Sequence, residues 1–228
     1  NRGLVPIYGD AILAPMSGYS DMPFRSICRE LGSAMSYTEF VPAPGINIGA
    51  DAVLRRLMFI AEERPITFQI FGSNADELAQ AAQRIEEMNP DIIDLNMGCW
   101  ADSVAQHGAG AGLLCTPQKI GEIFKRLTRA VGLPVTGKIR LGWDDSSRNY
   151  LEVAKILEDN GASLIAVHGR TKAQGYKGQV VSERSPSRRG SNGLVVLSTL
   201  LPVLAKSGVY STILVQGETY GGNALSYD

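Results

Sequence analysis

Short apolar runs alternate with longer amphipathic segments between Ala11 and Thr171, and this repeat limits the possible folds more than any other feature. The apolar runs predict six strands, at residues 11–15, 33–40, 66–71, 91–96, 135–140 and 163–168. The amphipathic segments predict helices at residues 21–32, 51–62, 74–88 and 149–160, and a further helix that begins near Pro117. Strands that alternate with helices form parallel sheets. We therefore expect an α/β protein with six βα units of a (β/α)8 TIM-type barrel, which is incomplete or irregular after the sixth unit.

The repeat stops near Gly178. Residues 179–192 are polar and of low complexity, which indicates a loop or disorder, and residues 194–205 and 212–215 could be strands or short helices. We therefore predict barrel units 1–6 in residues 1–178 and an atypical tail in residues 179–228. A shifted reading frame or a truncated gene is our hypothesis for this tail. Within the barrel, residues 41–49 form a Pro/Gly-rich segment that we expect to be a long loop.

Composition adds few limits. A net charge of −1 does not by itself indicate a protein that binds a polyanion, although cations can still gather on one face. The longest apolar stretch, residues 193–205, is too short and too polar to cross a membrane, so we expect no membrane association. The amino end does not resemble a secretory signal, and three cysteines without a CxxC spacing indicate reduced thiols. These features predict a cytoplasmic protein.

Polar residues gather where the predicted strands end, and the active site of a (β/α)8 barrel lies at the carboxyl ends of its strands. The residues at these ends are Pro15, Met16, Ser17, Glu39, Gln69, Asn96, Cys99, Lys138, Arg140, His168 and Arg170. Apolar strand bodies with polar ends predict a site at the mouth of the barrel.

Four of these positions have more than one interpretation. Cys99 lies on a glycine-rich loop that leaves a buried strand, so it is either placed for chemistry or a partly buried structural thiol. Lys138 and Arg140 are two residues apart on one strand and therefore face the same side, where two cations would suit a reduced flavin or an anionic substrate. A surface pair is the alternative. His168 is either a core histidine or a functional one.

Several ordered motifs resemble the tRNA-dihydrouridine synthase family. They are LAPMSG at 13–18, DMPFR at 21–25, TE at 38–39, QIFG at 69–72, DLNMGC at 94–99, GAGLL at 110–114, KIRLGW at 138–143 and VHGRT at 167–171. The resemblance runs continuously from about Gly9 to Gly178. It implies an FMN enzyme that uses NADPH to reduce uridine to 5,6-dihydrouridine in tRNA, and no protein partner is implied.

The resemblance also implies roles for individual residues. Cys99 would be the catalytic acid, and Asn96 and Arg140 would bind the uracil. The cofactor residues would be Pro15, Met16 and Ser17 along the isoalloxazine, Gln69 and Lys138 at its polar edge, and His168 near the ribityl phosphate or the substrate. No metal is expected. An extruded uridine would fit such a site, because a stacked base cannot lie on a flavin.

The sequence departs from the family at three points. Trp100 follows Cys99 where many members have proline. Beyond Gly178 we find neither the Asn-Gly-Asp nor the Gly-Arg segment that grips the FMN phosphate, and the helical tRNA-binding domain is absent. Two other functions therefore stay open at this stage: a flavin barrel oxidoreductase similar to dihydroorotate dehydrogenase, acting on a small molecule, and an inactive truncated member of the family.

Overall fold

A computed structural model describes residues 5–9, 11–177, 195–198 and 212–214. The described strands join one curved sheet in the order β1-β9-β8-β7-β6-β5-β4-β2, with β3 also paired to β4. The strands are β1 Ala11–Leu13, β2 Ser36–Tyr37, β3 Val41–Pro42, β4 Ile66–Phe71, β5 Ile92–Met97, β6 Val135–Arg140, β7 Leu164–His168, β8 Val195–Ser198 and β9 Thr212–Leu214. All neighbours from β2 to β8 are parallel, and β9 is antiparallel to both β8 and β1.

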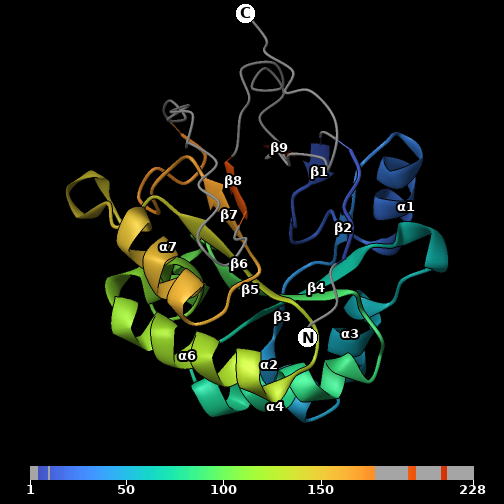
Figure 1. Cartoon of the computed structure of the whole chain (residues 1–228), viewed down its shortest axis with the longest axis horizontal. Coiled ribbons are helices and arrows are strands. Elements are labelled where there is room, and N and C mark those ends of the chain that lie inside the picture. Colours follow the sequence, from blue (N-terminus) through green and yellow to red (C-terminus); the bar gives the residue numbers. More distant parts are fainter. Residues whose placement is uncertain (1–4, 10, 178–194, 199–211, 215–228) are drawn as a thin grey trace, which may run out of the picture.

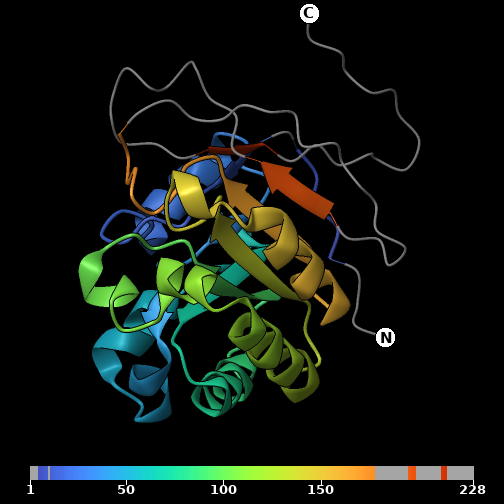
Figure 2. The ribbon, with the colours of Figure 1, turned by 90° about the vertical axis from the view of Figure 1, so that its left-hand side faces the viewer.

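Helices lie along the outer side of this sheet (Figures 1 and 2). The α-helices are α1 Met22–Glu30, α2 Ala43–Asn47, α3 Asp51–Leu54, α4 Ala75–Glu86, α5 Asp102–Ala105, α6 Pro117–Ala130 and α7 Tyr150–Asp159. Short 3-10 helices are η1 Arg55–Leu57, η2 Ala61–Glu63, η3 Gly110–Cys115 and η4 Asp145–Ser147. None of the helices in the described ranges is long and apolar enough to span a bilayer. In the described part of the chain the fold is thus an incomplete (β/α)8 barrel, as the sequence predicts.

Local signals explain where several elements begin and end. Asp21 caps α1, because its Oδ1 accepts a hydrogen bond of 3.0 Å from the backbone N–H of Phe24. Asn74 caps α4 in the same way, by accepting from the N–H groups of Asp76 and Glu77. Residues 66–71 and 135–140 are strands with the predicted bounds, and the other confirmed elements differ by one or two residues at their ends.

Three predictions in the second unit are wrong. The predicted strand 33–40 is only β2, because the Thr38 hydroxyl accepts the hydrogen bond of Gln69 N–H at 3.1 Å and interrupts the backbone ladder. The predicted loop 41–49 contains β3 and α2. The predicted helix 51–62 divides into α3, η1 and η2, because the backbone adopts an extended conformation at Met58. The carbonyl oxygen of Met58 accepts a hydrogen bond of 2.7 Å from the buried Arg25 side chain.

Alternation along the strands produces two separate cores. Odd positions of β5 such as Ile93 and Leu95 face the helices and pack in one cluster with Phe124 of α6. Even positions face the inside of the sheet, where Ile92 and Tyr37 belong to a second, smaller apolar cluster. Residues of one strand that lie two apart share a face. The polar residues further along the same inner face are therefore brought together above the small cluster.

Candidate active site

The register of the parallel strands places five predicted site residues on one inner face. Gln69 of β4 lies opposite Asp94 of β5, and Asn96 of β5 lies opposite Lys138 of β6. Arg140 of β6 lies opposite His168 of β7. These pairs sit near the carboxyl ends of their strands, as expected for a barrel mouth. The sequence prediction that Lys138 and Arg140 share the inner side is confirmed.

A chain of hydrogen bonds crosses this face. Thr136 donates its hydroxyl to Asp94 Oδ1 at 2.5 Å, and Gln69 Nε2 donates to Asp94 Oδ2 at 2.7 Å. Gln69 Oε1 then accepts from Asn96 Nδ2 at 2.9 Å. These four side chains, which we call the Asp94 network, are all buried. A buried polar network of this kind rigidifies a site when its members are satisfied.

The Asp94 network holds the backbone around Cys99. Asn96 Oδ1 accepts from the N–H of Gly98 at 3.1 Å and of Cys99 at 2.8 Å. An ionised carboxylate only accepts and a backbone N–H only donates, so the two ends of the network fix both amide orientations between them. The position of Cys99 is thereby tied to the charge of Asp94 through the amide of Gln69 on the neighbouring strand β4.

Burial raises the pKa of Asp94 to about 6, against the opposing effect of hydrogen bonds from Thr136 and Gln69 and of the Lys138 charge. Burial and the neighbouring Arg140 lower the pKa of Lys138 to about 8, whereas Asp94 opposes this shift. At neutral pH both groups are charged. The Lys138 ammonium group makes no hydrogen bond within the described residues, so it is a cation with donors to offer a ligand.

Arg140 connects two loops at the mouth. Its Nε donates to Gly98 O at 2.7 Å, and its Nη1 donates to Thr171 O at 3.0 Å and to Gly175 O at 2.8 Å. Burial lowers the pKa of Arg140 to about 10, which leaves it a cation. The guanidinium therefore joins the loop after β5, which carries Cys99, to the loop after β7.

Cys99 itself is a half-buried thiol on the loop after β5. Burial raises its pKa, with a hydrogen bond from the Ala101 backbone and the Arg140 charge acting in the opposite direction. The thiol is therefore protonated at neutral pH and can act as an acid. Gly110 packs against it at a positive φ of 54°, and a Cβ there would lie 3.0 Å from both Cys99 Cβ and Cys99 O. Only glycine fits this approach.

His168 is buried on the same face. Its pKa is lowered to about 2, first by burial and then by the charges of Lys138, Arg140 and Arg170. The ring is therefore neutral and can donate one hydrogen bond and accept another. It can orient a ligand in this form, but it does not attract a phosphate by charge.

Hydrogen bonds fix the conformation of the loop that follows β1. Met16 O accepts from the N–H of Ser20 at 2.9 Å, and Ser20 Oγ accepts from Met16 N–H at 2.8 Å. Gly18 N–H donates to the carboxylate of Glu39. Pro15, Met16 and Ser17 therefore lie on a pinned turn after β1. No hydrogen bond joins these three residues to the Asp94 network in the described part of the chain.

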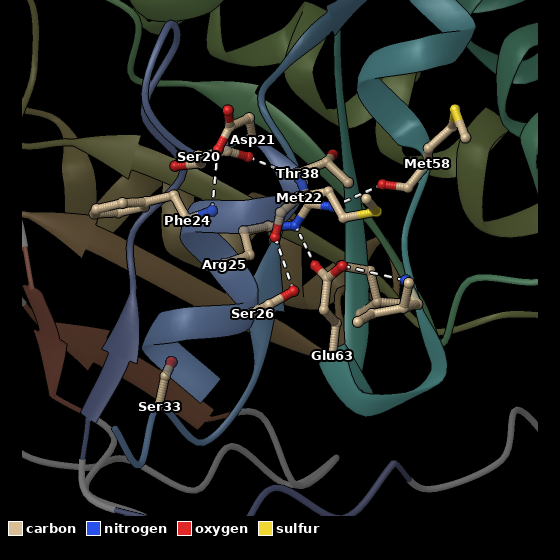
Figure 3. Close-up of polar contacts among 12 residues, drawn as sticks. Ser20, Asp21, Met22, Phe24, Arg25, Ser26, Ser33, Thr38, Met58 and Glu63 are labelled. Carbon is tan, nitrogen blue, oxygen red and sulfur yellow. Dashed lines mark hydrogen bonds and ion pairs between the residues drawn. The ribbon is translucent and has the colours of Figure 1, made fainter. Parts of the chain in front are cut away.

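Figure 3 shows what supports this turn: the fully buried ion pair between Arg25 of α1 and Glu63 of η2, at 2.5 Å. Arg25 also donates from Nη1 to Ser20 O at 2.8 Å. Glu63 uses its other oxygen to accept from Ile60 N–H at 3.2 Å. The pair thus connects the first unit to the segment before β4.

Sequence reasoning assigned no role to Asp94 or to Thr136. A signal was present for Asp94, because a carboxylate stands in the middle of the apolar strand IIDLNM, two positions before Asn96. Tyr176 was also missed. Its ring lies 5.8 Å from the Arg140 guanidinium, 5.8 Å from the Trp100 ring and 6.3 Å from the His168 ring, measured to ring centroids.

Moving the carboxylate from position 94 to position 69 tests whether the Asp94 network holds the backbone at Cys99. In Gln69→Glu, two carboxylates face each other without a donor, so amide hydrogen exchange at Gly98 and Cys99 is expected to accelerate about fivefold, as for a lost hydrogen bond of ~1 kcal/mol. The double variant Asp94→Asn/Gln69→Glu restores donor and acceptor at the wild-type net charge, and exchange should return to within about twofold. Equal exchange in all three proteins would contradict the network.

The raised pKa of Asp94 predicts a dependence of stability on pH. A carboxyl that binds its proton more tightly when folded stabilises the fold below its unfolded pKa of about 4. That contribution is lost as the pH rises through about 6. Urea unfolding should therefore show wild-type stability falling across this window relative to Asp94→Asn. A constant difference between the two proteins would show that Asp94 does not titrate in this range.

These features define a (β/α)-barrel protein with a polar, cation-rich site at the mouth and a protonated thiol on its rim. The sequence model of the dihydrouridine synthase (Dus) family matches residues 12–183. The chain belongs to the dihydrouridine synthase family.

Known relatives agree with this assignment. The chain is 44% identical to tRNA-dihydrouridine synthase B of Pseudomonas aeruginosa over 172 residues, which cover 75% of this chain and 52% of that protein. It is 40% identical to a probable tRNA-dihydrouridine synthase of Aquifex aeolicus, over 77% of this chain and 56% of the relative. A probable tRNA-dihydrouridine synthase 1 of Synechocystis is 36% identical over 92% of this chain and 57% of its own length. The chain spans about half the length of the curated relatives it matches.

Proposed function

We propose that this chain binds FMN and, with NADPH, reduces a uridine in tRNA to 5,6-dihydrouridine. One observation carries the proposal most: the loop with the protonated Cys99 thiol leaves β5 beside Lys138 of β6, whose ammonium group makes no hydrogen bond within the described residues. The names and the similarity of the relatives support the same activity. We assign the flavin-binding units 1–6 to residues 1–178. The interpretation of residues 179–228 as an atypical tail stays a prediction, although β8 and β9 come from this part of the chain.

The residues at the mouth fit a flavin. Lys138 can donate to the polar edge of the ring system, and its charge suits the anionic reduced form. Gln69 would lie beside it at that edge, and the pinned turn of Pro15, Met16 and Ser17 would line the ring. Neutral His168 would donate a hydrogen bond near the ribityl phosphate or the substrate. When bound, the flavin supplies the hydride for C6 of the uracil, and NADPH is the source of those electrons.

Three residues would act on the uracil. Asn96 has a second Nδ2 hydrogen to offer a carbonyl oxygen, since only the first is used by Gln69. Arg140 makes no hydrogen bond from Nη2 within the described residues, so this group can meet the other carbonyl. Cys99 would give its proton to C5, and the raised pKa keeps that proton in place until it is needed. Uridine, NADPH and one proton thus become dihydrouridine and NADP⁺.

The absorption spectrum of the purified chain with added FMN tests the cofactor part of the proposal. We expect bound flavin whose visible bands bleach when NADPH is added without oxygen. Lys138→Met should weaken FMN binding about tenfold or more, as expected for the loss of a charged hydrogen bond. Arg126→Met, an exposed cation on α6, is the matched control and should bind FMN normally. A folded chain that binds no flavin would contradict the proposal and support an inactive family member.

A further inference from the structure

Two exposed aromatic rings stand next to Cys99. Trp100 follows it directly and is 42% exposed, and Tyr176 of the loop after β7 is 56% exposed. Their ring centroids lie 5.8 Å apart in an edge-to-face arrangement with an interplanar angle of 83°. Exposed aromatic residues cost free energy in water, so a pair beside a catalytic candidate indicates a binding surface. The roles proposed above do not use this pair.

The indole of Trp100 is held in place on one side. Gly175 has a positive φ of 55°, and a Cβ built on it would lie 3.4 Å from Cε3 and 3.6 Å from Cδ2 and Cζ3 of Trp100. The backbone of Gly175 therefore packs against the six-membered ring. Arg140 holds this backbone in turn, through its hydrogen bond to Gly175 O. The ring is thus preorganised, and the exposed remainder faces outward.

The loop that carries Tyr176 is rich in basic residues. The loop 169–177 carries Arg170, Lys172 and Lys177 and contains no Asp or Glu. Lys177, next to Tyr176, is exposed. Lys172 forms an ion pair of 2.7 Å with Asp102, the first residue of α5 and two positions after Trp100, so its charge is paired and it connects the two segments. Aromatic faces for bases together with cations for phosphates are typical of single-stranded nucleic-acid sites.

We propose that Trp100 stacks against the nucleobase that neighbours the target uridine in the RNA strand, with Tyr176 as its lateral support and Lys177 facing the adjacent phosphates. This inference rests on the proposed function. Extruding a uridine removes a stacking partner from its neighbour, and an indole beside Cys99 can replace that partner. The site is specific to this chain's own residue after Cys99, since a proline there offers no comparable ring.

Tryptophan fluorescence can observe the contact directly. The chain has two tryptophans, so Trp143→Phe leaves Trp100 as the only one. Titration of this variant with a short oligoribonucleotide that has one central uridine should quench the fluorescence. An oligonucleotide that is abasic next to the uridine should bind without this quenching.

Trp100→Ala should weaken binding of the intact oligonucleotide about tenfold, within the range for one stacked base, and Trp100→Phe should restore most of it. The exposed Tyr8→Ala is the control and should bind normally.

The outcomes separate the inference from the proposed function. If the chain binds RNA and reduces uridine while Trp100→Ala binds equally well, the stacking surface is refuted and the proposed function stands. Equal quenching by the intact and the abasic oligonucleotide would show that only the backbone of the RNA is contacted, which also overturns the inference. If the wild-type chain neither binds RNA nor reduces uridine, the proposed function fails and the inference falls with it.

Discussion

Glu63→Ala is expected to lower the free energy of unfolding by about 3–5 kcal/mol, because it leaves the buried Arg25 cation without its partner. Both side chains of this pair are completely buried, and the distance between Arg25 Nε and Glu63 Oε2 is 2.5 Å. Arg25 also donates to Ser20 O and Met58 O (Figure 3). The loss should therefore loosen the turn that contains Pro15, Met16 and Ser17. Urea unfolding of the full chain measures the effect.

Two further variants make this prediction specific. Asp76→Ala removes an exposed ion pair with Arg126, and such pairs contribute only about 0–1 kcal/mol. Arg25→Met/Glu63→Met replaces both charges by apolar side chains, so it should recover much of the lost stability. A loss below about 1 kcal/mol in Glu63→Ala, similar to that of the exposed pair, would mean that the buried pair does not hold the first unit.

Cys99→Ala is expected to reduce the rate of uridine reduction by about 10²–10⁴-fold, the usual contribution of a general acid. The reduction of the flavin by NADPH should stay within about twofold of wild type, because that half-reaction needs no proton donor at C5. The comparison of the two rates, measured under anaerobic conditions, isolates the proton transfer. Cys115→Ala is the control, since this thiol is exposed and lies outside the inner face.

A different pattern would contradict the role of Cys99. If flavin reduction and uridine reduction fell together in Cys99→Ala, the thiol would be a structural element of the flavin site. If neither fell, the proton would come from another group.

The strands and the inner face could be predicted from sequence because both depend on local patterns. Strand β6 follows a Gly-Leu-Pro segment and carries the β-branched residues Val135 and Ile139, and the two-residue spacing of Lys138 and Arg140 fixes their common side. The second unit could not be predicted in this way. There the Thr38 hydroxyl replaces a backbone acceptor for Gln69, 31 residues away, and no local pattern reports such a contact.

Contacts between residues that are distant in sequence also limit how much of the site can be predicted from the sequence. Arg25 and Glu63 are 38 residues apart, and either one alone looks like a surface charge. The orientation of the Gln69 amide depends on Asp94, 25 residues away on the next strand. Sequence reasoning therefore found the residues that face the mouth but not the contacts that hold them. The roles given to the individual site residues stay predictions until they are measured.

Formation of dihydrouridine in unmodified tRNA tests the central claim most directly. The full chain would be incubated with FMN, NADPH and tRNA without oxygen, and the digested nucleosides would be analysed by mass spectrometry. We predict that the wild-type chain forms dihydrouridine and that Cys99→Ala forms almost none. A folded, flavin-loaded chain that is reduced by NADPH but leaves every uridine intact would contradict the account.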